Sequence, residues 1–135
     1  MTRTDKQVRY EPKSKVDREG RPYTPQTAAA DVEAILKVLE GRWKLVILFQ
    51  LFDGERHRFS DLERAIPAVS QKMLAQQLRQ LERDGVVRRF VHPEVPPKVE
   101  YCLTEWGLAL CPALDAMLVW AAQREVLSGG SGACR

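Results

Sequence analysis

The stretch Ser70–Gly85, SQKMLAQQLRQLERDG, decides the fold. Its apolar side chains recur at the three- and four-residue spacing that forms one stripe of an α-helix: Leu74, Leu78 and Leu81. The face opposite this stripe is basic or amide-bearing and carries no carboxylate: Lys72, Gln76, Arg79 and Arg83. Ser70 is a good N-cap, because its hydroxyl can accept a hydrogen bond from a free backbone N–H. The stretch therefore predicts an amphipathic helix whose polar side is suited to an anionic partner.

The residues before this helix predict a helix–turn–helix. A short helix is expected over DLERAI (61–66), with Ser60 and Glu63 at capping-box spacing. It stops before Pro67, and the four residues PAVS lead into the second helix. A short helix, a tight turn and a longer helix form the arrangement in which the second helix enters the DNA major groove. We therefore expect a recognition helix over about residues 70–84.

The residues that follow Gly85 change from helical to strand periodicity. VVRRFV (86–91) and VEYCLT (99–104) are β-rich and flank the proline-bearing loop HPEVPPK (92–98), which predicts a hairpin. Such a hairpin after a helix–turn–helix is a wing, expected over about residues 87–104. From 72 to 98 the chain carries six basic and three acidic side chains. The wing and recognition helix together therefore form a basic stretch.

Further helices are expected on both sides of this motif. The patterned segment that begins at Ala28 ends at Gly41, and WKLVILFQLF (43–52) is apolar on nearly all sides, which predicts a buried central helix. Thr104 can cap a last helix that runs to about Val126 and contains Pro112, which can kink it. The fold class is therefore mainly α (α+β): a winged helix–turn–helix with a β-hairpin wing and extra N- and C-terminal helices.

Three segments make up the chain of 135 residues. Residues 1–27 contain seven basic and four acidic side chains, so their net charge of +3 equals the formal net charge of the whole chain. These residues show no helical or strand period. We expect a flexible basic arm at 1–27, one domain at 28–127 and a flexible tail at 128–135.

The terminal helices predict a dimer. Their apolar surface is too wide for one small domain to cover, and a self-complementary interface would bury the excess. The expected interface residues come from the first and last helices: Val32, Ile35, Leu36, Leu110, Leu114, Met117, Leu118 and Trp120. A two-fold dimer would place two recognition helices about one DNA turn, roughly 34–36 Å, apart.

Double-stranded DNA is the expected partner. The expected DNA-binding residues lie on the recognition helix and the wing: Ser70, Gln71, Lys72, Met73, Gln76, Gln77, Arg79, Arg89 and Lys98. Ser70 and Gln71 would hold phosphate at the helix N-terminus, while Lys72, Gln76 and Arg79 would point into the major groove. Met73 and Gln77 lie at the margin of this face, and Arg89 with Lys98 would secure the flanking backbone. A winged-helix module that binds an acidic protein instead of DNA is the alternative.

Several other classes of protein fit the sequence poorly. The sequence contains no recognisable nucleophile–base pair and no glycine-rich phosphate loop, so it does not indicate an enzyme. No cofactor is expected. His57 and His92 lack ligand partners at metal-binding spacing, and the three cysteines have no C-x-x-C spacing. No apolar run approaches the roughly 20 residues that span a bilayer. A cytoplasmic protein without a membrane partner is expected.

The motifs together resemble those of the HxlR-type bacterial transcriptional regulators. The similarity covers about residues 31–122 and rests on these segments: Gly41-Arg42-Trp43, Arg58-Phe59, Ser70–Leu74, and Pro97–Tyr101 with Leu103-Thr104. The resemblance implies a winged-helix DNA-binding homodimer, often a repressor and sometimes an activator, with a small-molecule effector possible. Members that sense oxidants commonly carry a cysteine ahead of the first helix, where this chain has Ala30. Thiol switching by that route is therefore not expected.

Overall fold

A computed structural model describes residues 14–128 of the chain. Residues 1–13 and 129–135, and with them most of the expected tail, Cys134 and half of the expected arm, lie outside the described residues. The chain divides between Lys37 and Val38 into two compact units. The first contains most of α2 (Pro25–Leu39), and the second contains the remaining elements.

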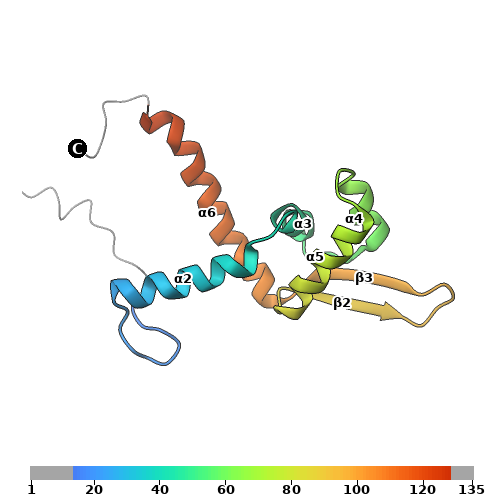
Figure 1. Cartoon of the computed structure of the whole chain (residues 1–135), viewed down its shortest axis with the longest axis horizontal. Helices are drawn as coiled ribbons and strands as arrows, with labels where there is room; N and C mark the ends of the chain where they lie inside the picture. The colour runs from blue at the N-terminus through green and yellow to red at the C-terminus, as the bar shows by residue number, and fades with distance from the viewer. Residues whose placement is uncertain (1–13, 129–135) are drawn as a thin grey trace, which may run out of the picture. The chain divides into compact units, whose positions relative to one another are not determined.

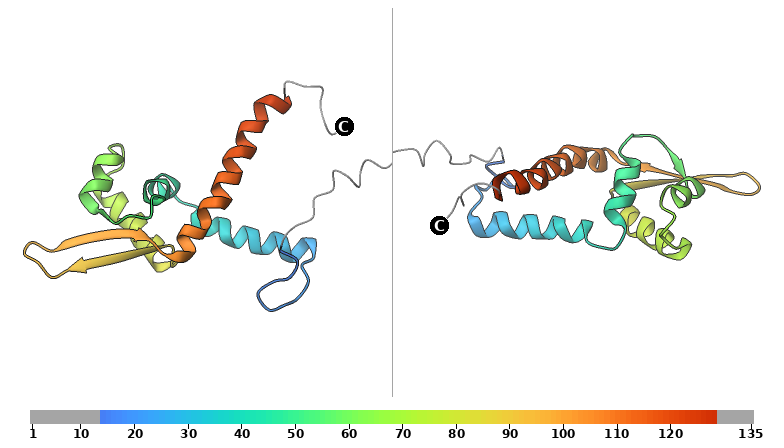
Figure 2. Two further views of the ribbon diagram at one scale, coloured as in Figure 1. Left: turned by 180° about the vertical axis from the view of Figure 1, so that it is seen from behind. Right: turned by 90° about the horizontal axis from the view of Figure 1, so that it is seen from above.

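The second unit is a helix–turn–helix followed by a hairpin. Its elements are α3 (Lys44–Leu51), β1 (His57–Arg58), α4 (Phe59–Ala65), α5 (Gln71–Arg83), β2 (Val87–His92), β3 (Lys98–Leu103) and α6 (Glu105–Ser128). The strands form one antiparallel sheet in the order β1-β3-β2, so β3 is central. Figure 1 shows the hairpin of β2 and β3, and both views of Figure 2 show it extending beyond α3, α4 and α5. The winged helix–turn–helix predicted from the sequence is confirmed.

The core of this unit lies between α3, α4, α5 and the sheet. Its fully or almost fully buried side chains include Ile47, Leu48, Leu51, Leu62, Leu74, Leu78, Leu81, Val86 and Val87. The predicted leucine stripe of α5 is confirmed, because all three leucines are completely buried. At about 25 cal/mol per Å² of apolar surface, this stripe alone contributes several kcal/mol to folding. The stripe thereby leaves the opposite side of α5 facing outward.

The central helix α3 differs from the sequence prediction. Ile47, Leu48 and Leu51 are buried, as expected for a core helix. However, the side chains on its other side are exposed by more than two fifths: Leu45, Val46 and Phe49. The prediction of a buried central helix therefore holds for one side of α3 and not for the other.

Two helix starts also differ from the prediction. The helix α4 begins at Phe59, because the Asp61 carboxylate accepts a hydrogen bond from the backbone N–H of Arg58 at 3.0 Å. The expected cap at Ser60 is wrong, since a carboxylate of the first turn takes this role. The first helix begins at Pro25, three residues before Ala28, and an isolated bridge between Val16 and Pro22 closes the loop ahead of it. Residues 25–27, expected in the arm, are therefore helical.

Thr104 joins the end of the recognition helix, the wing and α6. Its hydroxyl donates to the backbone carbonyl of Gly85 at 2.7 Å and accepts from the N–H of Gly107 at 3.0 Å. The N–H of Thr104 donates to the carbonyl of Val86 at 3.0 Å. The sequence predicts Thr104 as a helix cap, and its bond from Gly107 confirms this prediction. We call Gly85, Val86, Thr104 and Gly107 the Thr104 junction.

Candidate nucleic-acid interface

The N-terminus of α5 has open backbone N–H groups that can bind an anion. Ser70 has extended backbone angles, and its hydroxyl accepts from the N–H of Met73 at 3.0 Å, as predicted. The carbonyl of Ser70 accepts from the N–H of Leu74. The N–H groups of Gln71 and Lys72 belong to the open end of the helix, where the helix dipole favours negative charge.

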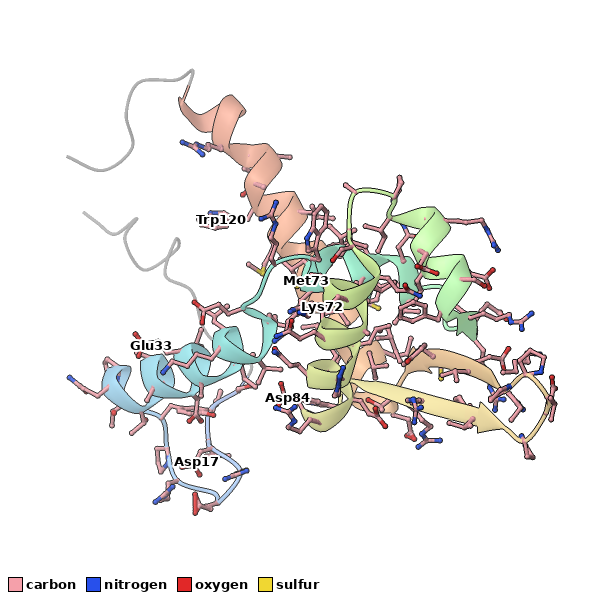
Figure 3. The ribbon with its side chains drawn as sticks, turned by 45° about the vertical axis from the view of Figure 1, so that its right-hand side comes forward. Asp17, Glu33, Lys72, Met73, Asp84 and Trp120 are labelled. Carbon is pink, nitrogen blue, oxygen red and sulfur yellow. The ribbon has the colours of Figure 1, made fainter. Side chains whose placement is uncertain are left out.

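The outward face of α5 carries basic and amide side chains. Gln71, Lys72, Gln76 and Arg79 are exposed, and Met73 is half-buried beside them. Figure 3 shows the side chains along this helix between the labelled Lys72 and Asp84. Neither Lys72 nor Arg79 forms an ion pair with another residue in the described range 14–128. Their charges are therefore available to an external anion.

Gln77 does not lie on this face. The side chain is only 5% exposed, and its Nε2 donates to the sulfur of Met73 at 3.4 Å. Its Oε1 is buried and has no hydrogen-bond partner among the described residues. A Cβ atom added at Gly41 would lie 2.9 Å from this oxygen, so the side chain fills the space beneath that glycine. The expectation that Gln77 contacts DNA is wrong, because it packs inside the domain.

The wing carries its charges on two different faces. In the register of the hairpin Arg89 lies opposite Tyr101, whereas Arg88 lies opposite Cys102. Successive residues of a strand point to opposite sides of the sheet, so Arg88 and Arg89 project from different faces. Both side chains are exposed. Arg89 is on the same face as Tyr101.

Lys98 is engaged within the wing. Its Nζ lies 3.7 Å from a carboxylate oxygen of Glu100, and its side chain is about one third exposed. The same carboxylate accepts a hydrogen bond from His92 Nε2 at 2.7 Å and lies 3.9 Å from Arg56. This arrangement neutralises part of the Lys98 charge, so it is less available for DNA than Arg89.

Replacing Glu100 with glutamine should change the pH dependence of stability. The hydrogen bond from His92, followed by the charges of Lys98 and Arg56, lowers the pKa of Glu100. A lowered folded-state pKa gives stability that is present above the unfolded pKa of about 4.3 and is lost as the pH falls through the folded value. We expect E100Q to lower the urea midpoint at pH 7 and to approach the wild type well below pH 4.3. An equal difference at both pH values would contradict this assignment.

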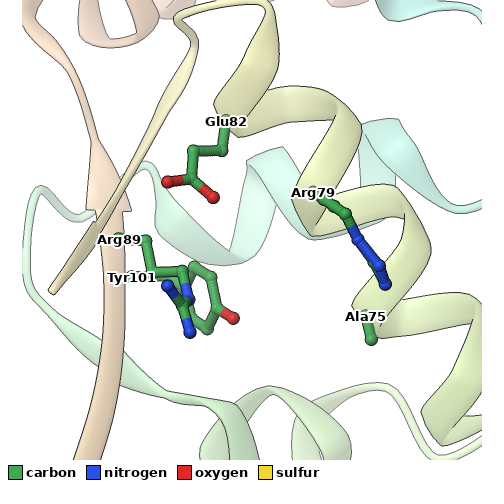
Figure 4. Close-up of a pocket in the computed structure, with 5 residues that line it drawn as sticks. All are labelled: Ala75, Arg79, Glu82, Arg89 and Tyr101. Carbon is green, nitrogen blue, oxygen red and sulfur yellow. The ribbon is translucent and has the colours of Figure 1, made fainter. Parts of the chain in front are cut away.

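A groove separates α5 from the face of the sheet that carries Arg89. It has a volume of about 350 Å³ and is lined by Ala75, Arg79, Glu82, Arg89 and Tyr101. Figure 4 shows Arg79 on the helix side and Arg89 on the strand side, and Arg89 is the register partner of Tyr101. These residues come from α5, β2 and β3, so spacing along the chain does not connect them. We call this feature the helix–wing groove.

The expected dimer residues are only partly exposed. Those exposed by more than two fifths are Val32, Ile35, Leu36, Met117, Leu118 and Trp120, the last by 71%. Leu114 is 5% exposed, and Leu110 packs against the core of its own unit. Both were expected at the interface; the burial of Leu114 within one chain corrects that expectation for Leu114, while Leu110 is only partly buried. The exposed apolar side chains of α3, and Val119 on α6, are not among the expected interface residues.

Among residues 14–128, one helix is long and apolar enough by length and composition to cross a membrane. The segment Glu105–Arg124 of α6 has 20 residues and a mean hydropathy of 1.2. The expectation that no uninterrupted apolar run approaches about 20 residues is a different criterion, because Asp115 interrupts this segment. The segment also contains Glu105, Asp115 and Arg124, and an apolar helix that packs against another copy has the same composition.

Metal and thiol chemistry depend on grouped metal-ligand side chains and on free cysteines in the described part of the chain. Residues 14–128 contain no group of three or more His, Cys, Asp or Glu side chains placed to hold a metal ion. Cys102 and Cys111 are free and half-buried. A reactive thiol needs exposure and a lowered pKa, and half-burial limits the first of these.

Comparisons with known proteins identify relatives over most of the chain. A family model described as HxlR-like helix-turn-helix matches residues 38–126. The uncharacterised HTH-type transcriptional regulator YtcD of Bacillus subtilis (strain 168) is 53% identical over 91 residues, which cover 67% of this chain and 71% of YtcD. A crystal structure of YtcD has 52% identity and a TM-score of 0.64, covering 69% of this chain and 94% of that one. The reduced form of the redox regulator HypR has 44% identity and a TM-score of 0.65, covering 74% and 99% of the two chains.

Proposed function

Because the chain belongs to the HxlR-like helix-turn-helix family, we propose that it binds specific duplex DNA as a homodimer and represses transcription in the cytoplasm. The observation that carries this proposal is the exposed face of α5. That face presents Lys72, Gln76 and Arg79 outward while the leucine stripe holds the helix in the core. These side-chain types hydrogen-bond to base edges and phosphates in the major groove.

The remaining contacts would position the duplex. Ser70 and Gln71 lie at the open end of α5, where backbone N–H groups can hold a phosphate. Met73 can touch thymine methyl groups at the margin of the face. Arg89 would bind the flanking backbone, and Lys98 would add a weaker contact because Glu100 shares its charge.

A dimer is part of this proposal. Apolar patches above a few hundred Å² are rare on monomers, and the exposed apolar side chains on α2 and α6 are numerous. A second copy that covers them would also place two recognition helices on one face of the DNA. The operator would then be two-fold symmetric or repeated.

The proposal is tested by fluorescence anisotropy on duplex from the region upstream of the gene itself. A scrambled duplex of equal length is the control, and both are titrated at several salt concentrations. We expect the upstream duplex to bind at least about 10³-fold more tightly, with a steep salt dependence from released counterions. If neither duplex binds at low salt, the exposed face of α5 does not recognise DNA, and the alternative of an acidic protein partner is favoured.

Replacing Gln76 with alanine should relax the choice of base at one operator position. A bidentate contact from glutamine to adenine contributes about 1–3 kcal/mol of discrimination. We expect Q76A to bind the operator more weakly and single-base variants at that position almost as tightly as the wild type does. Gln123→Ala, the same substitution at an exposed position of α6, is the control for a general effect of the change. An equal loss on all sequences would show that Gln76 does not read a base.

A further inference from the structure

The helix–wing groove brings two exposed arginines to opposite walls. Arg79 projects from α5, and Arg89 projects from β2 beside Tyr101 (Figure 4). Within the described residues 14–128 neither guanidinium forms an ion pair, although Glu82 lines the same groove. Three other arginines, Arg21, Arg56 and Arg64, do form ion pairs. Two free guanidinium groups that share one groove favour a shared anion.

The shape of the groove suits a phosphate group. Guanidinium groups bind phosphate oxygens through two parallel N–H donors, so two of them can hold one tetrahedral anion from both sides. Ala75 lines the groove with a single methyl group, which leaves the space between the arginines open. A volume of about 350 Å³ exceeds one phosphate and leaves room for the attached sugar or for water.

We propose that the helix–wing groove is a phosphate site in which Arg79 and Arg89 hold the same phosphate group. When the phosphate belongs to the DNA backbone, this inference rests on the proposed function. It assigns Arg79 to the backbone, whereas the sequence predicts that Arg79 enters the major groove. The phosphate then ties the recognition helix and the wing to one point on the duplex.

Glu82 limits what this site accepts. Its carboxylate lines the groove with the two arginines, so the site carries two positive charges and one negative charge. A single phosphate is attracted, while a second anion meets the carboxylate. Removing this charge in Glu82→Gln should therefore tighten phosphate and DNA binding about threefold or more without a change of sequence preference.

The first test replaces single phosphates of the operator with uncharged methylphosphonates, one position at a time. The proteins are the wild type, R79A, R89A and R88A. Arg88 is the matched control, because it carries the same charge on the adjacent residue and projects from the other face of the sheet. We expect each groove variant to bind about 10- to 100-fold more weakly than the wild type. One methylphosphonate position should weaken the wild type and R88A but leave both R79A and R89A unaffected.

A change of shape without a change of charge supplies a second variant. Ala75→Leu fills the groove from the helix side and preserves helix propensity. The Ala75→Leu protein should bind the operator as weakly as R79A does. Its binding should be insensitive to the same methylphosphonate. The shared site would be overturned if R79A and R89A became insensitive to methylphosphonates at different positions. It would also be overturned if the Ala75→Leu protein bound the operator as tightly as the wild type does.

A free phosphate is the other source of this chemistry and is tested without DNA. Inorganic phosphate is titrated at constant ionic strength while the side-chain Nε–Hε signals are followed by NMR. Joint, saturable shifts of Arg79 and Arg89, with none at Arg88, support the site even if the operator experiment fails. The proposed function would then be wrong while the phosphate site stands. If DNA binding is unspecific and the two signals do not shift together, the site itself is overturned.

Discussion

Replacing Gly107 with alanine is expected to lower the free energy of unfolding by about 3 kcal/mol or more. Gly107 is buried in the first turn of α6. An added Cβ would overlap the backbone carbonyl oxygen of Val86 and lie 3.2 Å from side-chain atoms of Leu103. The carbonyl of Val86 cannot move away easily, because it accepts hydrogen bonds from Thr104. Helix propensity alone predicts the opposite, a gain of about 1 kcal/mol for alanine.

Urea denaturation checks this prediction, with Gly54→Ala as its control. Gly54 has a positive φ of 78°, and nothing lies within 4 Å of an added Cβ there. That change should cost only the strain of a left-handed backbone, about 1–2 kcal/mol. A Gly107→Ala protein as stable as the Gly54→Ala protein would show that α6 can shift away from Val86.

Replacing Leu118 with glutamate is expected to prevent self-association and to weaken operator binding by about 100-fold or more. Leu118 is 53% exposed on α6, so the folded unit can accept a charge there. In the proposed dimer the carboxylate would be buried without a partner, which strongly opposes association. A monomer loses the gain of about 10²–10⁴ that comes from holding two half-sites at once.

Light scattering measures the mass of the variant, and anisotropy measures its affinity for the operator. Gln123→Glu is the matched control, because it adds the same charge at an exposed position of the same helix. If the L118E protein still has the mass of two chains, the dimer interface lies on another apolar surface. The exposed side of α3, with Leu45, Val46 and Phe49, is the next one to change.

The leucines of α5 show how far the sequence predicts this fold. Their spacing alone defines a stripe, and the chemistry of Ser70 defines where the helix begins, so local rules suffice for both. Gln77 shows the limit of classifying by residue type. At about 100° per residue it falls nearer to Leu81 than to the cations, so its position predicts burial while its polarity predicts exposure. The structure agrees with its angular position on the helix and not with its polarity.

The other misses depend on contacts between elements. The residues of α3 are apolar on both sides, so the pattern alone cannot tell the side that meets the core from the exposed side. The helix–wing groove needs Arg79 from α5, Arg89 from β2 and Tyr101 from β3. Their meeting depends on the register of the hairpin and its packing on α5. Spacing along the chain carries neither kind of information.

The Thr104 junction has a consequence for how a signal could travel. Short hydrogen bonds at 2.7 and 3.0 Å tie the start of α6 to the residues that end the recognition helix. The glycine at 107 leaves no spare space between them. These bonds couple the start of α6 to the end of α5, so we expect a tilt of α6 to move α5 with it. In the proposed dimer, a ligand that changes the angle between two copies would turn both reading faces out of phase with the DNA helix.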